Sequence, residues 1–277
     1  TFLTLIAAAA FRSTTSVLYM PIEMEFGWTR VTTAGAVGLN ILVYGLTAPF
    51  AAVLMAKFGP KRVALSALAL ISSGTLLTTV MTEPWQLYLA WGVLVGVGTG
   101  CLALVFGAAV ANNWFVKRRG LIVGIFSAAY ATGQLLFLPA ITAVAADSGW
   151  RQATFIVSGF CIALIPIFGI FFKNAPSDGE APYGGTPEDI PAKPPVTVKA
   201  NFEAMTQAVK KPAFWALATT FFVCGWTTNG LIGAHFIPAA HDHGMPVTMA
   251  ADLLAVQGLD GGLSLLIGTH LDEAEAL

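Results

Sequence analysis

The chain has 277 residues, of which 56% are hydrophobic and only 10% are charged, and its formal net charge at pH 7 is −1. A soluble domain of this length normally has about a quarter charged residues, so the composition excludes an ordinary water-soluble protein, and the near-neutral charge favours no nucleic-acid partner. The mean hydropathy of +0.74 indicates a chain that lies mostly within a lipid bilayer.

Apolar segments of roughly 20 residues, each long enough to cross a bilayer, recur from the beginning of the chain. The connections between them are short, and Glu83-Pro84 and Asp147-Ser148-Gly149 are clear turn signals. These segments predict a six-helix transmembrane bundle over residues 1–173. Its expected spans are residues 2–20, 31–55, 63–81, 85–111, 121–145 and 153–172.

The composition changes over residues 174–211, where closely spaced prolines and glycines rule out a further span. We expect a flexible cytoplasmic linker there, with a short surface helix over about 202–209. A seventh span at about 214–237 and an eighth at about 249–267 follow, so residues 212–277 are expected to begin a second bundle. The predicted fold is an all-α membrane protein with one complete bundle and one incomplete bundle.

The Lys and Arg residues are unevenly distributed among the connections. Eleven of the 14 lie in alternate connections, whereas the others hold only Arg30 and Arg151, and Arg12 lies inside the first span. Short loops rich in Lys and Arg stay in the cytoplasm, which predicts a multi-pass plasma-membrane protein (the inner membrane in a bacterium) with a cytoplasmic N-terminus. The eleven cations are Lys57, Lys61, Arg62, Lys117, Arg118, Arg119, Lys173, Lys193, Lys199, Lys210 and Lys211.

Arg12 is the outstanding polar residue at membrane depth, where a charged side chain is costly and is a functional candidate by default. Ser16 and Tyr19 follow it at i+4 and i+7 and extend one polar stripe along the helix. A cation that faces a central cavity would bind a carboxylate or a similar anion. The alternative, that Arg12 reaches an interface or pairs structurally, is disfavoured by its near-central position.

Two further polar pairs are spaced i, i+4: Asn40 with Tyr44, and Tyr130 with Gln134. Either pair could face a water-filled cavity or provide hydrogen bonds between helices, and the sequence leaves both interpretations open. In the seventh span, Asn229 and His235 are candidates of the same kind. A membrane-embedded histidine titrates near neutral pH and could couple transport to protons; a histidine bonded to a backbone carbonyl is the equally acceptable alternative.

Four glycines of the fourth span, Gly92, Gly96, Gly98 and Gly100, include two overlapping Gly-x-x-x-Gly steps. Small residues at this spacing let two helices approach closely. We therefore expect this span to pack tightly against its neighbours.

Enzyme chemistry and metal binding have little support. The chain lacks the common metalloprotease, phosphate-loop and serine-elbow motifs, so we expect no enzyme and no cofactor. The tripeptide His241-Asp242-His243 is too weak a signal for a metal site. Cys101, Cys161 and Cys224 all fall inside spans, and we interpret them as small packing residues without a disulfide.

The loop Leu54-Met-Ala-Lys-Phe-Gly59-Pro-Lys61-Arg62 resembles in part the Gly-x-Leu-x-Asp-Arg-x-Gly-Arg-Lys loop of the major facilitator superfamily. The matching positions are Leu54, Lys57, Gly59 and Lys61. Ala52 and Ala56 replace the first Gly and the Asp, so this loop lacks the acid to which the family's charge-relay role is ascribed. Gly59 suits the tight turn.

Three further segments resemble the bacterial branch of this superfamily that is monocarboxylate-transporter-like and oxalate/formate-antiporter-like. Arg12 also lies close to the position of a substrate-contacting cation in the first helix of monocarboxylate transporters. The resemblance covers about residues 1–256. The segments are Trp114-Phe-Val-Lys117-Arg118-Arg119-Gly-Leu-Ile-Val-Gly124, Phe26-Gly27-Trp28-Thr29-Arg30 and Gly149-Trp150-Arg151.

This resemblance implies a secondary active transporter of small organic anions, mono- or dicarboxylates, which works by alternating access as a proton symporter or as an antiporter. The expected substrate-binding residues are Arg12, Tyr19, Asn40, Tyr44, Tyr130, Gln134, Asn229 and His235. The expected gating residues of the cytoplasmic loops are Lys57, Gly59, Lys61, Arg62, Lys117, Arg118 and Arg119.

A full-length member of the family has a complete second bundle, and residues 258–277 resemble none of its cytoplasmic loops. We therefore expect the chain to be truncated and not competent for transport alone. The alternative from another class is a non-transporting membrane sensor or an inert transporter remnant. A membrane enzyme ranks below both, because no catalytic set is visible.

Overall fold

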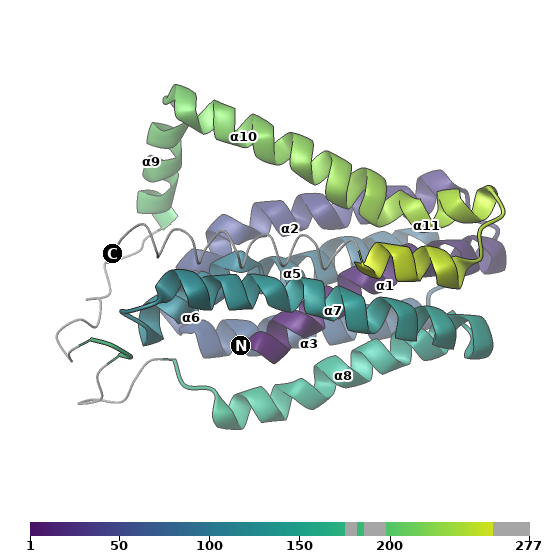
Figure 1. The fold of residues 1–277 in the computed structure, drawn as a ribbon, viewed down its shortest axis with the longest axis horizontal. Helices are drawn as coiled ribbons and strands as arrows, with labels where there is room; N and C mark the ends of the chain where they lie inside the picture. The colour runs from purple at the N-terminus through teal and green to yellow at the C-terminus, as the bar shows by residue number, and fades with distance from the viewer. Residues whose placement is uncertain (175–181, 186–197, 257–277) are drawn as a thin grey trace.

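The computed structural model describes residues 1–174, 182–185 and 198–256, and all regular secondary structure within these ranges is helical apart from one isolated bridge between Phe115 and Tyr183. This confirms the all-α fold class. Figure 1 shows the long helices lying side by side along the long axis of the molecule. The first bundle contains α1 (Phe2–Phe26), α2 (Arg30–Phe58), α3 (Pro60–Thr79), α4 (Pro84–Leu87), η1 (Tyr88–Val95), α5 (Gly96–Cys101), α6 (Leu104–Trp114), α7 (Arg119–Ser148) and α8 (Trp150–Phe171).

Six helical segments of the described chain are long and apolar enough to cross a membrane. They coincide with the six predicted spans, and their ends lie within three residues of the predicted ones, except that α1 continues six residues further, to Phe26. Helical ends extend beyond the apolar core because the first and last turns lie in the polar interface. The six segments are α1, α2, α3, the run Pro84–Trp114 from α4 to α6, α7 and α8.

The fourth span is irregular, because the π-helix η1 and a break before α6 interrupt it. Its glycines make the close contacts that the sequence predicted. A Cβ added at Gly96 or Gly100 would lie 3.1 Å and 2.9 Å from backbone oxygens of α2, those of Asn40 and Tyr44. At Gly98 it would lie 2.9 Å from the backbone oxygen of Ala67 in α3. This span therefore packs closely against both α2 and α3.

The main core joins all six spans of the first bundle around large side chains such as Trp91, Phe106 and Ile22. Several buried hydroxyl groups donate within their own helices: the Oγ atoms of Ser72 and Thr75 donate to carbonyl oxygens one turn earlier. This pattern suits a lipid environment, where water cannot satisfy a polar group.

The second part of the chain contains α9 (Val198–Val209), α10 (Pro212–Cys224), η3 (Gly225–Ile232), α11 (Gly233–Asp242) and a short apolar helix, Val247–Val256. The expected surface helix corresponds to α9. The expected seventh span corresponds to α10, η3 and α11, which follow one another without interruption. Of the expected eighth span only the part up to residue 256 is described, and residues 258–277 lie outside the described ranges.

The second part packs on the first at one end. Ile237 of α11 and Leu254 are buried against Val17 of α1 and Leu138 of α7, whereas α10 has no buried residue. In Figure 1, α10 lies along the upper edge of the molecule and leads into α11 at the right. Contact between the two parts is thus concentrated at the right-hand end of this view.

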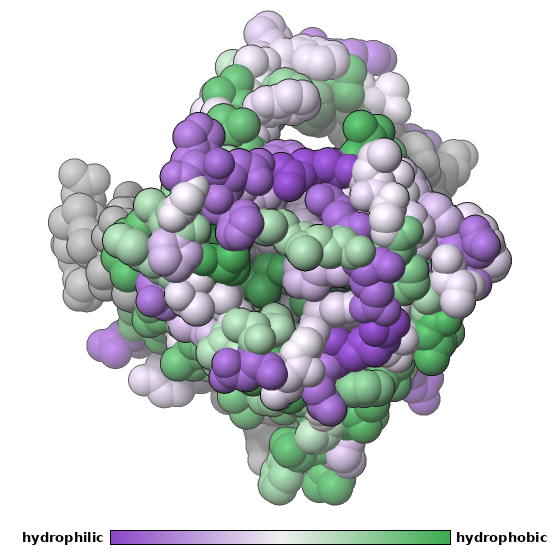
Figure 2. Space-filling view, turned by 90° about the vertical axis from the view of Figure 1, so that its right-hand side faces the viewer, coloured by the Kyte–Doolittle hydropathy of each residue, from purple (hydrophilic) through white to green (hydrophobic). Residues whose placement is uncertain are grey.

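The three predicted cytoplasmic loops of the first bundle meet at the opposite end, here called the Lys117 end. The backbone N–H of Lys61 donates to Asn174 Oδ1 at 2.8 Å, and Asn113 Nδ2 donates to the backbone oxygen of Asn174 at 3.2 Å. The other end, here called the Arg30 end, contains Arg30 and Arg151. Hydrophilic side chains form much of its surface (Figure 2). The connections rich in Lys and Arg and the connections that hold only Arg30 and Arg151 thus lie at opposite ends of the first bundle.

Candidate functional site

A cavity of about 190 Å³ lies within the first bundle, between α1, α2, α5, α6 and α7. Among the residues that line it, Arg12 is the one charged side chain, and most of the others are apolar. The lining residues are Leu5, Ala8, Arg12, Tyr44, Thr99, Leu102, Ala103, Leu104, Gly107, Phe126 and Ser127. A concave, mostly apolar site with few polar groups is the usual form of a small-molecule site.

The guanidinium of Arg12 lies over the ring of Tyr44, with Cζ 4.6 Å from the ring centroid. Such a contact stabilises the cation by about 0.5–2 kcal/mol, depending on its exposure to water. The planar guanidinium group matches the geometry of a carboxylate, with which it can form two parallel hydrogen bonds. The structure therefore brings two of the predicted binding residues together in one anion-compatible cavity.

Tyr19 and His235 meet where the two parts of the chain adjoin. Tyr19 is 2% exposed, and its ring stacks on that of His235 with 6.3 Å between centroids and 27° between planes. Gln134 makes a second contact of this kind: its Nε2 donates to the backbone oxygen of Leu254 at 3.4 Å. These three predicted residues lie outside the lining of the Arg12 cavity and at the contacts between the two parts.

Asn40 donates through Nδ2 to the backbone oxygen of Trp91 at 2.6 Å. For Asn40, the structure thus supports the second of the two interpretations, a hydrogen bond between helices. The Asn40 side chain points to η1, whereas Tyr44, one turn later, lines the cavity. Tyr130 lies in α7 and Asn229 in η3, but their side chains are outside the described structure.

The predicted gating loops include Gly59, which has φ 85°. A Cβ at this position would lie 2.8–2.9 Å from the side-chain amide of Asn174, so glycine fits both the left-handed backbone and the space. Arg118, with φ 58°, precedes α7, and Arg119 Nε donates to the backbone oxygen of Phe115. Lys57, Lys61, Arg62 and Lys117 belong to the same two loops.

Sequence reasoning missed Asn174 and the acidic residues near the Arg30 end. Asn174 follows the sixth span in a segment that was interpreted only as a linker. Glu25 receives hydrogen bonds from Trp150 Nε1 at 2.6 Å and from Arg151 NH1 at 2.8 Å. A sequence signal was available only for Glu23, which precedes Arg30 by seven positions in the same connection.

Six apolar spans, four of which line a mostly apolar cavity that contains Arg12, indicate a multi-pass membrane protein. The sequence model of the Major Facilitator Superfamily matches residues 1–273. The chain belongs to the Major Facilitator Superfamily, a family of membrane transporters and not of enzymes.

Curated relatives agree with this assignment. The chain is 25% identical to the oxalate:formate antiporter of Oxalobacter formigenes over 87% of its own length and 54% of that protein. It is 25% identical to human monocarboxylate transporter 11 over 90% of this chain and 50% of the relative. It is 28% identical to chicken monocarboxylate transporter 4 with the same two coverages. The chain spans about half the length of the curated relatives it matches.

Proposed function

We propose that this protein is a secondary active transporter of small organic anions that works by alternating access, with the substrate carboxylate bound at Arg12. The observation that carries the proposal is the position of the Arg12 guanidinium, over Tyr44 and at the wall of a 190 Å³ cavity. The names of the relatives, which refer to monocarboxylates, oxalate and formate, support a small organic anion as the substrate.

The lining favours a monocarboxylate with a short apolar tail. One cation can neutralise one carboxylate, and Arg12 is the one cation in the described lining. A second carboxylate would be held against side chains such as Leu102 and Phe126, where an unpaired charge is strongly disfavoured. A methyl or ethyl group in the same place would be favoured, because it buries apolar surface.

We infer the orientation of the protein in the membrane from its two ends, and the coupling of transport from His235. The Lys117 end gathers the cationic loops, and we assign it to the cytoplasm because cationic loops are retained there. His235 stacks on Tyr19 between the two parts, and its imidazole has two ring nitrogens that can donate or accept a proton. We assign it the role of a proton-coupling group.

Carboxylate binding by the purified full chain in detergent tests the proposal. Acetate, lactate and oxalate are titrated while the thermal unfolding temperature is recorded. Loss of charged hydrogen bonds costs about 1.5–3 kcal/mol, so Arg12→Ala is expected to weaken binding by about 10- to 100-fold. Lys210→Ala is the matched control, because it removes an exposed cation between α9 and α10, and it is expected to bind as the parent does.

Three outcomes decide whether a carboxylate binds at Arg12. Stabilisation by lactate that Arg12→Ala abolishes and Lys210→Ala retains supports the proposal. Equal loss in both variants shows general electrostatic attraction and contradicts a site at Arg12. If none of the three anions stabilises a folded sample, the alternative of a non-transporting sensor or remnant is favoured.

A further inference from the structure

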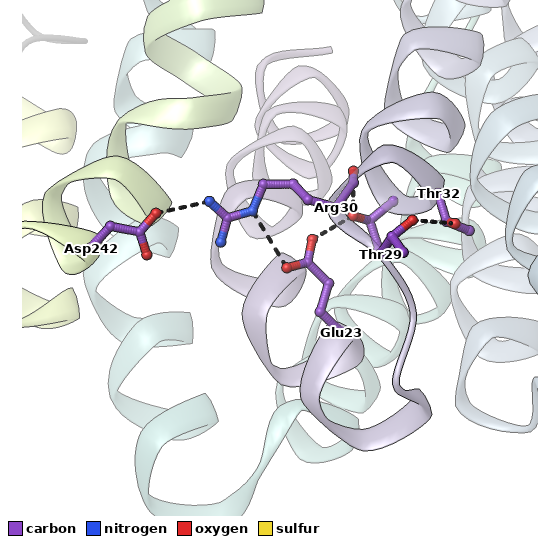
Figure 3. Close-up of polar contacts among 6 residues, drawn as sticks. Glu23, Thr29, Arg30, Thr32 and Asp242 are labelled. Carbon is purple, nitrogen blue, oxygen red and sulfur yellow. Dashed lines mark hydrogen bonds and ion pairs between the residues drawn. The ribbon is translucent and has the colours of Figure 1, made fainter.

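Arg30 takes part in an ion cluster that joins the two parts of the chain (Figure 3). Its NH1 donates to Asp242 Oδ2 at 3.0 Å, and the two residues are 212 positions apart in the sequence. Arg30 begins α2 in the first bundle, whereas Asp242 ends α11 in the second part. The pair therefore connects two bodies that alternating access requires to separate at this end.

Glu23 holds the Arg30 guanidinium in place from within the first bundle. Its Oε2 lies 3.5 Å from Arg30 Nε, and its Oε1 accepts a hydrogen bond from Thr33 Oγ1 at 2.6 Å. The Glu23 side chain is only 13% exposed, compared with 43% for Arg30. Arg30 is thus oriented by its own bundle whether or not Asp242 is present, and Asp242 is the partner that can leave.

The packing around this pair closes the Arg30 end. Ile237, five residues before Asp242, is 1% exposed and lies against Val17 of α1 and Leu138 of α7. In the same segment nearer the Lys117 end, α10 buries no residue. A rigid rotation of α11 away from α1 would break the Arg30–Asp242 pair and expose Ile237 in one movement.

A second ion cluster at the same end provides the contrast. Arg151 NH2 lies 2.6 Å from Glu25 Oε1, and the exposures of the two side chains, 41% and 39%, resemble those of Arg30 and Asp242. Arg151 begins α8 and Glu25 ends α1, so this pair lies entirely within the first bundle. Separation of the two parts would leave it intact.

We propose that Arg30 and Asp242 form a gate that holds the Arg30 end closed, with Glu23 as the positioning residue for Arg30. Breaking the pair shifts the protein toward a state that is open at this end. The effect is moderate, because both side chains are exposed and an exposed ion pair contributes at most about 1 kcal/mol, a factor of about five in population. A weak pair suits a gate that opens in every cycle, and the role in transport rests on the proposed function.

Alkylation of one buried cysteine tests the gate. Ile237→Cys is introduced into the full chain after Cys101, Cys161 and Cys224 have been replaced by alanine, and its reaction with N-ethylmaleimide is timed in detergent without any carboxylate. Arg30→Gln and Asp242→Asn are each expected to raise the rate about two- to fivefold, and Arg30→Lys less. The double variant is expected to exceed neither single variant, because both remove the same interaction.

Arg151→Gln is the matched control, since it removes a similar charge at the same end, and its rate is expected to equal that of the parent. Rates that rise equally in Arg30→Gln and Arg151→Gln, or effects of Arg30→Gln and Asp242→Asn that add in the double variant, overturn the gate. The test is independent of the anion site. If alkylation is faster in Arg30→Gln and Asp242→Asn as expected but the protein binds no carboxylate, only the proposed function is overturned. If the protein binds carboxylate but these variants do not change the alkylation rate, only the gate is overturned.

Discussion

Replacing Gly100 by alanine is expected to disturb both the packing of the fourth span and the anion cavity. The new Cβ would lie 2.8 Å from Thr47 Cβ and 2.9 Å from the backbone oxygen of Tyr44. A backbone oxygen cannot rotate away as a side chain can, and Thr47 is fixed by its hydrogen bond to the backbone oxygen of Val43 at 2.7 Å. Helix α2 must therefore move by about half an ångström to restore van der Waals contact, and Tyr44 moves with it.

The magnitude follows from two opposing contributions. Overpacking of a tight interface costs about 1–3 kcal/mol, whereas replacing glycine by alanine inside a helix contributes about 1 kcal/mol in favour of folding. The net loss for Gly100→Ala is therefore about 0–2 kcal/mol, or a fall of up to about 8 °C in unfolding temperature at roughly 2–4 °C per kcal/mol.

Thermal unfolding in detergent measures this loss, and Gly45→Ala is the matched control. Gly45 lies in α2 as well, but a Cβ there would meet nothing within 4 Å, so its variant is expected to unfold at the parent temperature or above. Gly100→Ala is also expected to weaken carboxylate binding, because Tyr44 supports Arg12. If Gly100→Ala is as stable as Gly45→Ala, the reasoning from close helix contact is refuted.

Two further changes test other parts of the structure. Asn174→Ala removes the acceptor of the Lys61 N–H at the start of α3 and is expected to lower the stability by about 1 kcal/mol. Faster amide hydrogen exchange at Lys61 would support this expectation. The control is Asn112→Ala at an exposed position, and equal exchange at Lys61 in the two variants would contradict it. Phe126→Ala widens the Arg12 cavity and is expected to improve binding of hexanoate relative to acetate, measured by competition. An unchanged preference would show that Phe126 does not set the size of the site.

The spans and their arrangement by charge could be predicted from the sequence, because both depend on local composition. The second span was expected over residues 31–55 and the structure has Arg30–Phe58, a difference confined to the helix ends. The superfamily could also be predicted, since its signatures lie in short loops such as that around Gly59. Arg12 could also be identified from the sequence, because a cation in the middle of an apolar span is a candidate functional residue whatever its neighbours are.

The partners of polar residues were decided by the tertiary structure. Asn40 and Tyr44 share one face of α2, yet Asn40 bonds to the backbone of η1 and Tyr44 contacts Arg12. The Arg30–Asp242 pair depends on how α11 lies against α1 and α2, and no local pattern connects residues so far apart. The free-energy cost of placing a polar group in a membrane is set by its type and depth, which the sequence contains. The neighbour that offsets this cost depends on helix rotation and packing, which only the folded chain defines.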